Sequence, residues 1–176
     1  MFAGRECQAL LTASINISLD ETTANSLNWT LFELASRPQL QHDLRKEIRN
    51  AQSTAQARGD TGLTAHDIDR LPLLNSVCKE ALRYHPVVPM PQRVVVRDEI
   101  LPLSKPLKLS SGRYIKEIPI RKGQKVAPNL AAYQRSKEIW GEDADQFRPE
   151  RWLEDQPKRD VTLGLIGNLS VKCCLF

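Results

Sequence analysis

The sequence has no long hydrophobic run. None of its apolar stretches approaches the roughly 18–20 residues that a membrane-spanning helix needs. The first residues, Met1 to Cys7, also lack the charged and then apolar order of a secretory signal peptide. We therefore expect no membrane span, no anchor and no signal peptide in these 176 residues.

Cysteine is scarce and poorly spaced for metal binding. The four cysteines, Cys7, Cys78, Cys173 and Cys174, form no Cys-x-x-Cys pair and no ligand spacing with the three histidines. No metal site is expected from them, and a reduced intracellular setting is the simplest assumption. Cys78 falls on the apolar face of a predicted helix, where we expect it to pack as a small hydrophobic side chain.

A basic stripe interleaved with aromatic residues is missing as well. The net charge of +4 is spread along the chain, and its densest basic group, Lys116 to Lys125, is interrupted by Glu117 and an Ile-Pro-Ile run. This pattern disfavours nucleic-acid binding. With 41% hydrophobic and 26% charged residues, the composition is instead that of an ordinary globular domain.

Hydrophobic periodicity predicts helices in the first half of the chain. One long helix is expected from about Gln8 to Ala35, and a second begins after Pro38, with an apolar residue at every fourth position. This second helix is expected to give way to a loop over Gln52–Gly62. Thr64-Ala-His-Asp67 then matches a capping box that opens a short helix to Leu71.

The pattern changes from helices to strands after Pro86. The helix before this proline carries Val77 and Ala81 on its apolar face. An extended segment over Val94–Val96 and a hairpin that turns at Ser110–Gly112 are expected next, followed by an irregular, proline-bearing stretch. No repeat or domain boundary is evident. We therefore predict one domain over residues 1–176, mainly α with a small β-sheet (α+β).

Two motifs carry the strongest functional signal. Glu80 and Arg83 lie three residues apart on a predicted helix, where alone they would form a solvated ion pair worth about 0.2–0.5 kcal/mol. A second stretch, Phe147-Arg-Pro-Glu-Arg-Trp152, follows far downstream. Together the motifs resemble the cytochrome P-450 family, the haem-thiolate monooxygenases. The resemblance implies a buried network in which the Glu80 carboxylate orients the guanidinium groups of Arg83 and Arg151.

A third stretch adds to the resemblance. Ser18-Leu-Asp-Glu-Thr-Thr23 is similar to the family's oxygen-activation segment, which implies that Glu21 and Thr22 relay protons to dioxygen. The alternative is that both are polar-face residues of a helix. The sequence departs from the pattern at Leu19, where the family has a glycine, so we expect poor turnover or a shifted helix register.

The resemblance also gives expectations for a cofactor contact. Arg93 lies in the first extended segment after the Glu-x-x-Arg helix, where the family's arginine pairs with a haem propionate. The alternative is a surface arginine on an edge strand. His85 has no second ligand at a useful spacing, and we interpret it as a structural residue.

The family's haem-thiolate loop, Phe-x-x-Gly-x-Arg-x-Cys-x-Gly, is not recognisable in the chain. Cys173 and Cys174 have neither the preceding motif nor a following glycine. The resemblance spans about Ile15 to Asn168 and implies a partial fold, from the oxygen-activation helix to the meander before the cysteine loop. We therefore expect a fragment that lacks the front part of the domain and the axial cysteine, and that is inactive alone.

The resemblance implies that the parent protein is a haem-dependent monooxygenase of small organic substrates, most like fungal microsomal members. It further implies an NADPH-dependent flavoprotein reductase as electron donor, and an endoplasmic reticulum protein with a cytoplasmic catalytic domain. Two alternatives stay open. One is a non-catalytic fragment that binds a partner through exposed apolar helix faces, and the other is an unrelated basic helical binding protein.

Overall fold

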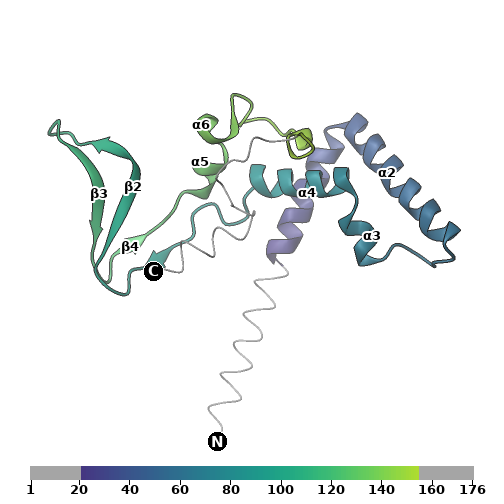
Figure 1. Cartoon of the computed structure of the whole chain (residues 1–176), viewed down its shortest axis with the longest axis horizontal. Coiled ribbons are helices and arrows are strands. Elements are labelled where there is room, and N and C mark those ends of the chain that lie inside the picture. The colour runs from purple at the N-terminus through teal and green to yellow at the C-terminus, as the bar shows by residue number, and fades with distance from the viewer. Residues whose placement is uncertain (1–20, 155–176) are drawn as a thin grey trace, which may run out of the picture. The chain divides into compact units, whose positions relative to one another are not determined.

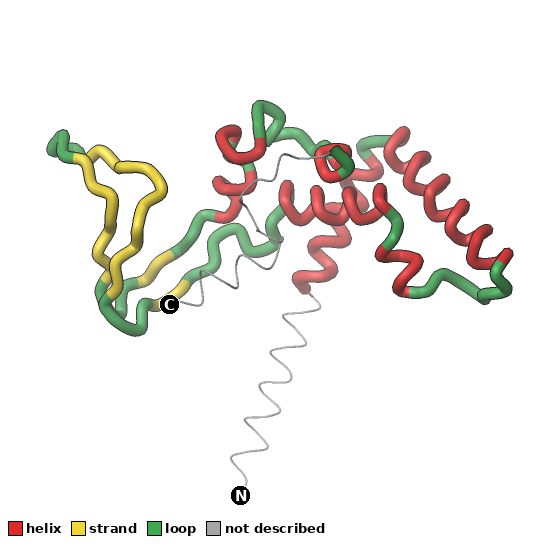
Figure 2. Tube along the Cα trace, in the orientation of Figure 1, coloured by secondary structure: helices red, strands yellow, loops and turns green. Residues whose placement is uncertain are grey.

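The computed structural model describes residues 21–154, which divide between two compact units (Figure 1). One unit holds the residues up to Val87 together with those from Ala131 onward, and the other is Val88–Leu130. The first is helical and the second contains the strands, so the predicted mainly α fold with a small sheet is confirmed (Figure 2). Among the described residues, no helix has the length and apolar character of a membrane span.

The helical unit begins with a helix over residues 21–35. The part of the predicted helix before residue 21 lies outside the described residues. Glu33 is 4% exposed, whereas Leu27, Leu31 and Phe32 are each more than half exposed. The helix stops just before Pro38, as the restriction on a residue preceding proline predicts.

Helix α2, Pro38–Ala57, is longer than the sequence pattern suggested. The expected loop from Gln52 was wrong, because the helix continues for another turn and a half through alanines and glutamines that favour helical backbone. Ala55 is buried at 1% exposure and holds this last part in place. The helix ends where Gly59 takes a φ of 89°, the left-handed conformation that glycine adopts without a steric penalty.

The predicted capping box is confirmed at the start of α3, Ala65–Asp69. The Asp67 amide donates to the Thr64 hydroxyl over 3.2 Å, and the Thr64 amide donates to the Asp67 carboxylate over 2.9 Å. Arg58 donates to the same carboxylate over 2.9 Å. Hydrogen bonds from Thr64, and then from Arg58, hold the pKa of Asp67 well below its usual range.

Helix α4, Pro72–Tyr84, has no cap from its own N-terminal residue. Glu47 of α2 supplies one, because its two carboxylate oxygens accept from the amides of Leu73 and Leu74, each over 2.9 Å. A helix N-terminus leaves such amides without partners and favours a negative charge nearby. One glutamate therefore both caps α4 and ties it to α2.

The buried face of α4 is centred differently from the prediction. Val77, Glu80 and Ala81, at intervals of three and four residues, are at most 3% exposed. Cys78 is exposed, so the expectation that it packs inside was wrong. Successive helix residues point about 100° apart, which carries Cys78 to the edge of this face.

The chain after the strands contains three short helices within the stretch that was expected to be irregular. They are α5 (Leu130–Gln134), α6 (Lys137–Trp140) and the 3₁₀ helix η1 (Pro149–Trp152). Helix η1 packs against α4, where Phe147 and Pro149 are buried. This packing sets the position of the charged residues of η1.

The strand unit has two antiparallel pairs. Strand β1 (Arg93–Val94) pairs with β4 (Lys125–Val126), and β2 (Glu99–Lys108) pairs with β3 (Tyr114–Ile120). The second pair is the predicted hairpin, with Gly112 at a φ of 82° in its turn. Two of the three valines expected to be extended, those at 95 and 96, lie beyond β1.

We expect Glu47→Ala to lower the free energy of unfolding of the full chain by about 1–2 kcal/mol, because two amides at the start of α4 lose their acceptor. Asp43→Ala on the same helix is the matched control, since the Asp43 carboxylate accepts from the exposed Gln39 amide and caps no helix in the described part of the chain. Denaturant unfolding measures both. Equal effects would contradict the capping role of Glu47.

Candidate functional site

The candidate site is built on the middle of α4. Glu80 and Arg83 are three residues apart on this helix, and both side chains are 0% exposed. The Arg83 guanidinium meets the Glu80 carboxylate in a two-pronged contact, with Nε to Oε2 at 2.8 Å and Nη2 to Oε1 at 2.7 Å. This geometry is the strong, directional form of an arginine–carboxylate pair.

The Glu80 carboxylate accepts donors from η1 and its approach as well. Its Oε1 accepts from Arg151 Nε at 3.0 Å and from the Arg148 amide at 2.8 Å. Its Oε2 accepts from the indole Nε1 of Trp152 at 2.9 Å. The carboxylate thus joins the middle of α4 to residues about seventy positions later in the chain.

Arg83 extends the network to backbone oxygens. Its Nη1 donates to the carbonyls of Gln134 and Ala144 over 2.6 and 2.8 Å, and its Nη2 donates to the carbonyl of Gln146 over 2.9 Å. With the two bonds to Glu80, all five guanidinium N–H groups have acceptors. A lysine could not replace this side chain, because it lacks the planar fork.

Arg151 lies on η1 and is 3% exposed. Besides Glu80, it bonds the Asp143 carboxylate over 3.2 Å and the Asp143 carbonyl over 2.9 Å. The structure therefore brings Glu80, Arg83 and Arg151 into one buried network, hereafter the charge network. Each of the three side chains makes several directional hydrogen bonds in this arrangement.

The arginines of the charge network favour the ionised forms of Glu80 and of its neighbour Asp143. Burial alone would raise the pKa of Glu80, but the hydrogen bonds of Arg83 and the Arg148 amide, with the charges of Arg83 and Arg151, bring it below its ordinary value. The same balance applies to Asp143, where desolvation is outweighed by the hydrogen bond and charge of Arg151, so that its pKa is also lowered.

Two members of this arrangement were not anticipated from the sequence. Trp152 contributes an N–H donor, and Arg148 contributes its backbone amide rather than its side chain. The tryptophan at the end of the Pro-Glu-Arg-Trp motif is a usable signal, since a buried indole requires an acceptor. The contact of the Arg148 backbone amide could not be predicted, because every residue except proline has such an amide.

A second buried carboxylate lies where the helix over residues 21–35 meets the end of α4. Glu33 accepts from Arg37 and contacts His85 Nε2 at 2.6 Å. The Trp29 ring stacks on the His85 imidazole, with centroids 4.1 Å apart and planes 9° apart. His85 is thereby held between a carboxylate and an aromatic ring.

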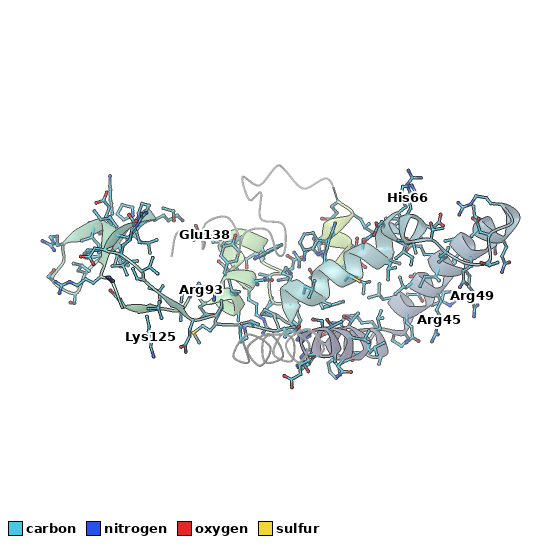
Figure 3. All side chains as sticks on the ribbon, turned by 90° about the horizontal axis from the view of Figure 1, so that it is seen from below. Arg45, Arg49, His66, Arg93, Lys125 and Glu138 are labelled. Carbon is cyan, nitrogen blue, oxygen red and sulfur yellow. The ribbon has the colours of Figure 1, made fainter. Side chains whose placement is uncertain are left out.

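The remaining candidates belong to elements other than α4. Glu21 and Thr22 open the described part of the first helix, with Glu21 exposed and Thr22 half-buried. Arg93 is an exposed residue of β1 in the strand unit (Figure 3), and its Nη1 donates to the carbonyl of Gln92 at 3.0 Å. Leu19, Cys173 and Cys174 lie outside the described residues. Among those that are described, no three His, Cys, Asp or Glu side chains form a metal-binding group.

The family model and the relatives that match this chain point to the same family. The family model for cytochrome P450 matches residues 20–163. Cytochrome P450 monooxygenase claP of Ampulloclitocybe clavipes is 39% identical over 153 residues, which cover 85% of this chain and 28% of that protein. Ganoderic acid synthetase of Ganoderma lucidum is 36% identical over 137 residues, covering 78% of this chain and 25% of that protein.

Solved structures agree with the sequence comparison. A zebra fish cytochrome P450, in a structure with abiraterone, matches with a TM-score of 0.59 and 28% identity. The match covers 76% of this chain and 28% of the zebra fish chain. This chain therefore spans little more than a quarter of the proteins to which it is similar.

We expect Glu80→Ala to lower the free energy of unfolding by about 3–5 kcal/mol, because it leaves two buried guanidinium groups without their shared carboxylate. Arg151→Ala should lower it by about 2 kcal/mol or more, because buried oxygens of Glu80 and Asp143 lose their donor. Arg58→Ala, which removes the ion pairs of an exposed arginine with Asp60 and Asp67, is the control and should change stability much less than Glu80→Ala. Urea unfolding of the full chain distinguishes the cases. Similar losses in all three variants would rule out a special role for the buried network.

Acid should weaken the charge network. A carboxylate whose pKa is lowered by folding contributes its full stability above its unfolded pKa, about 4, and loses it as the pH falls through the folded value. We expect the free energy of unfolding to fall from pH 5 to lower pH, and to fall less steeply in Asp143→Asn. Asp145→Asn, at an exposed neighbour, should keep the parent slope; identical slopes in both variants would contradict the assignment.

Proposed function

The chain belongs to the cytochrome P450 family, and we propose that it is part of a haem-dependent monooxygenase that acts on small organic substrates. The observation that carries the proposal is the buried charge network of Glu80, Arg83 and Arg151. Three ionised groups are costly to bury and add little net stability compared with apolar residues. Their value lies in a single geometry for the segment around η1 that packs on α4, and we propose that this segment supports the haem side of the domain.

Haem held by a cysteine thiolate would supply the iron chemistry that cleaves dioxygen. Among the described residues, Arg93 would hold one edge of the cofactor. The guanidinium of Arg93 is exposed and could take a propionate in place of its bond to Gln92. Cys78, the single cysteine among the described residues, lies inside α4 without a glycine-rich loop, and we do not assign it as the ligand.

Glu21 and Thr22 are proposed to handle protons. The Glu21 carboxyl is exposed and the Thr22 hydroxyl is half-buried, which is the order needed to carry a proton from solvent inward. A hydroxyl can donate one proton and accept another, and a carboxyl can reload it. In this proposal Thr22 Oγ1 delivers the proton and Glu21 replenishes it.

We further propose that the whole protein receives electrons from an NADPH-dependent flavoprotein reductase and works at the endoplasmic reticulum membrane with its catalytic part in the cytoplasm. These assignments rest on family membership alone. We propose that this chain, in which no haem-thiolate cysteine loop is recognisable, is inactive by itself.

The carbon monoxide difference spectrum tests the function. We expect the reduced full-length protein to show the absorption shift of a thiolate-ligated haem, and this chain alone, supplied with haem, to lack it. A shift in the isolated chain would overturn the proposed inactivity. Absence of the shift in a haem-loaded full-length protein would overturn the monooxygenase assignment.

Thr22→Ala in the haem-loaded full-length protein should slow product formation at least tenfold, because general acid–base groups typically contribute about 10²–10⁴-fold. Thr23→Ala is the matched control, since Thr23 is the exposed neighbour on the same turn. Haem content and product formation are measured together. Equal turnover in the two variants, at equal haem content, would assign Thr22 to the polar face of the helix only.

A further inference from the structure

The hairpin of β2 and β3 ends in a tight turn that carries two serines (Figure 1). Two backbone hydrogen bonds close the turn, from the Leu109 amide to the Arg113 carbonyl at 2.8 Å and from the Gly112 amide to the Leu109 carbonyl at 2.9 Å. Ser110 and Ser111 lie between the closing residues, and both are exposed. Neither serine hydroxyl forms a hydrogen bond with a residue that the structure describes.

Positive charge flanks this turn on both sides. Lys108 precedes Ser111 by three positions and Arg113 follows it by two, and both side chains are exposed. Neither cation forms an ion pair with a carboxylate in the described part of the chain. The acidic residue nearest to the turn in sequence is Glu117, which pairs with Pro102 beyond the register shift of the hairpin. The surroundings of Ser111 are therefore basic.

The end of the hairpin can open without unfolding the rest of the strand unit. Residues 103–106 of β2 lie opposite Lys116 alone, and this register shift separates the end of the hairpin from its base. Beyond the shift, two residue pairs join the strands. Leu107 and Tyr114 of these pairs are 49% and 63% exposed, so apolar burial holds the end closed only weakly. Local opening would let the turn extend into the active site of an enzyme.

We propose that Ser111 is a phosphorylation site for a protein kinase that selects basic segments. In this step Ser111 Oγ attacks the γ-phosphorus of ATP, so that an Oγ–P bond forms, the bond from the γ-phosphorus to the bridging oxygen breaks, and ADP leaves with that electron pair. The hydroxyl proton passes to the catalytic aspartate of the kinase. Carboxylates beside the kinase active site would receive Lys108 and Arg113.

The phosphate would change the charge of the turn. A phosphoserine carries about −1.5 to −2 charges at pH 7, which offsets the charges of Lys108 and Arg113. The same two side chains can donate charge-assisted hydrogen bonds to the phosphate oxygens. Phosphorylation would thus convert a cationic turn into a nearly neutral one. The site lies in the strand unit, and the proposal does not depend on haem or on the proposed monooxygenase activity.

Other hydroxyls of the described residues fit a basic-selective kinase less well. Thr61 also follows an arginine by three positions, but the carboxylates of Asp60 and Asp67 bind the guanidinium of Arg58. Hydroxyls on the helices lie on backbone that would have to unfold before it could extend through a kinase groove. Ser111 combines an exposed hydroxyl, a turn that opens locally and unpaired cations on both sides.

Phosphate transfer to the full chain is the measurement. The chain is incubated with ATP and the catalytic domain of protein kinase C, which selects serines with basic flanks, and the modified residue is mapped by mass spectrometry. Ser111→Ala should remove most of the phosphate incorporation. Ser110→Ala is the matched control, because Ser110 is the exposed neighbour in the same turn, and this variant should retain the incorporation.

A second pair of variants tests the recognition of charge. Lys108→Gln combined with Arg113→Gln should lower kcat/KM for phosphorylation about tenfold, because the kinase loses two charge-assisted contacts. The control combines Arg121→Gln with Lys122→Gln, which removes two exposed cations from another turn of the strand unit. Circular dichroism checks that every variant remains folded.

Phosphate on Ser111 that depends on the two flanking cations supports the proposal. The proposal is overturned if the chain takes up no phosphate, if the phosphate maps to Ser110 or to another residue, or if both charge variants lose rate equally. Casein kinase 2, which selects acidic flanks, is the second probe. Faster phosphorylation of Ser111 by this kinase than by protein kinase C would overturn recognition through the basic flanks.

Discussion

The described helical unit depends on one buried carboxylate. Glu80 has no solvent exposure, yet it remains ionised because two guanidinium groups, a backbone amide and an indole all donate to it. Removing Glu80 would leave two buried guanidinium groups unpaired in a site that water cannot reach, which is far more costly than the net worth of the pairs. The network therefore specifies where η1 docks on α4 more than it adds to overall stability.

Glutamate carboxylates contact α4 at three places along its length. Glu47 accepts from the amides at its start, Glu80 holds its middle, and Glu33 contacts His85 just after its end. Each glutamate joins α4 to a different part of the unit: α2, the η1 segment and the first helix. A helix of thirteen residues is thus oriented by three directional contacts, which nonspecific apolar packing could not supply.

Much of this could be predicted from the sequence, and the failures have physical causes. Three predicted features depend on local chemistry, and all three are present. They are the helix that ends before Pro86, the capping box at Thr64 and the hairpin turn at Gly112. The extension of α2 through Ala55 depends on tertiary burial, and the exposure of Cys78 depends on which residues centre the buried face. The bonds of Glu80 to a backbone amide and to an indole arise only when distant segments meet. The roles of Glu21, Thr22 and Arg93 stay predictions.

A double-mutant cycle between Glu80→Gln and Arg151→Met tests the central claim most directly. The free energy of unfolding of the full chain is measured for the parent, both single variants and the double variant. If the Glu80 carboxylate fixes η1 on α4, the coupling energy should be about 1.5 kcal/mol or more, whereas a cycle that pairs Arg151→Met with Glu117→Gln on β3 should give almost none. A coupling energy near zero for Glu80 and Arg151 would contradict the account.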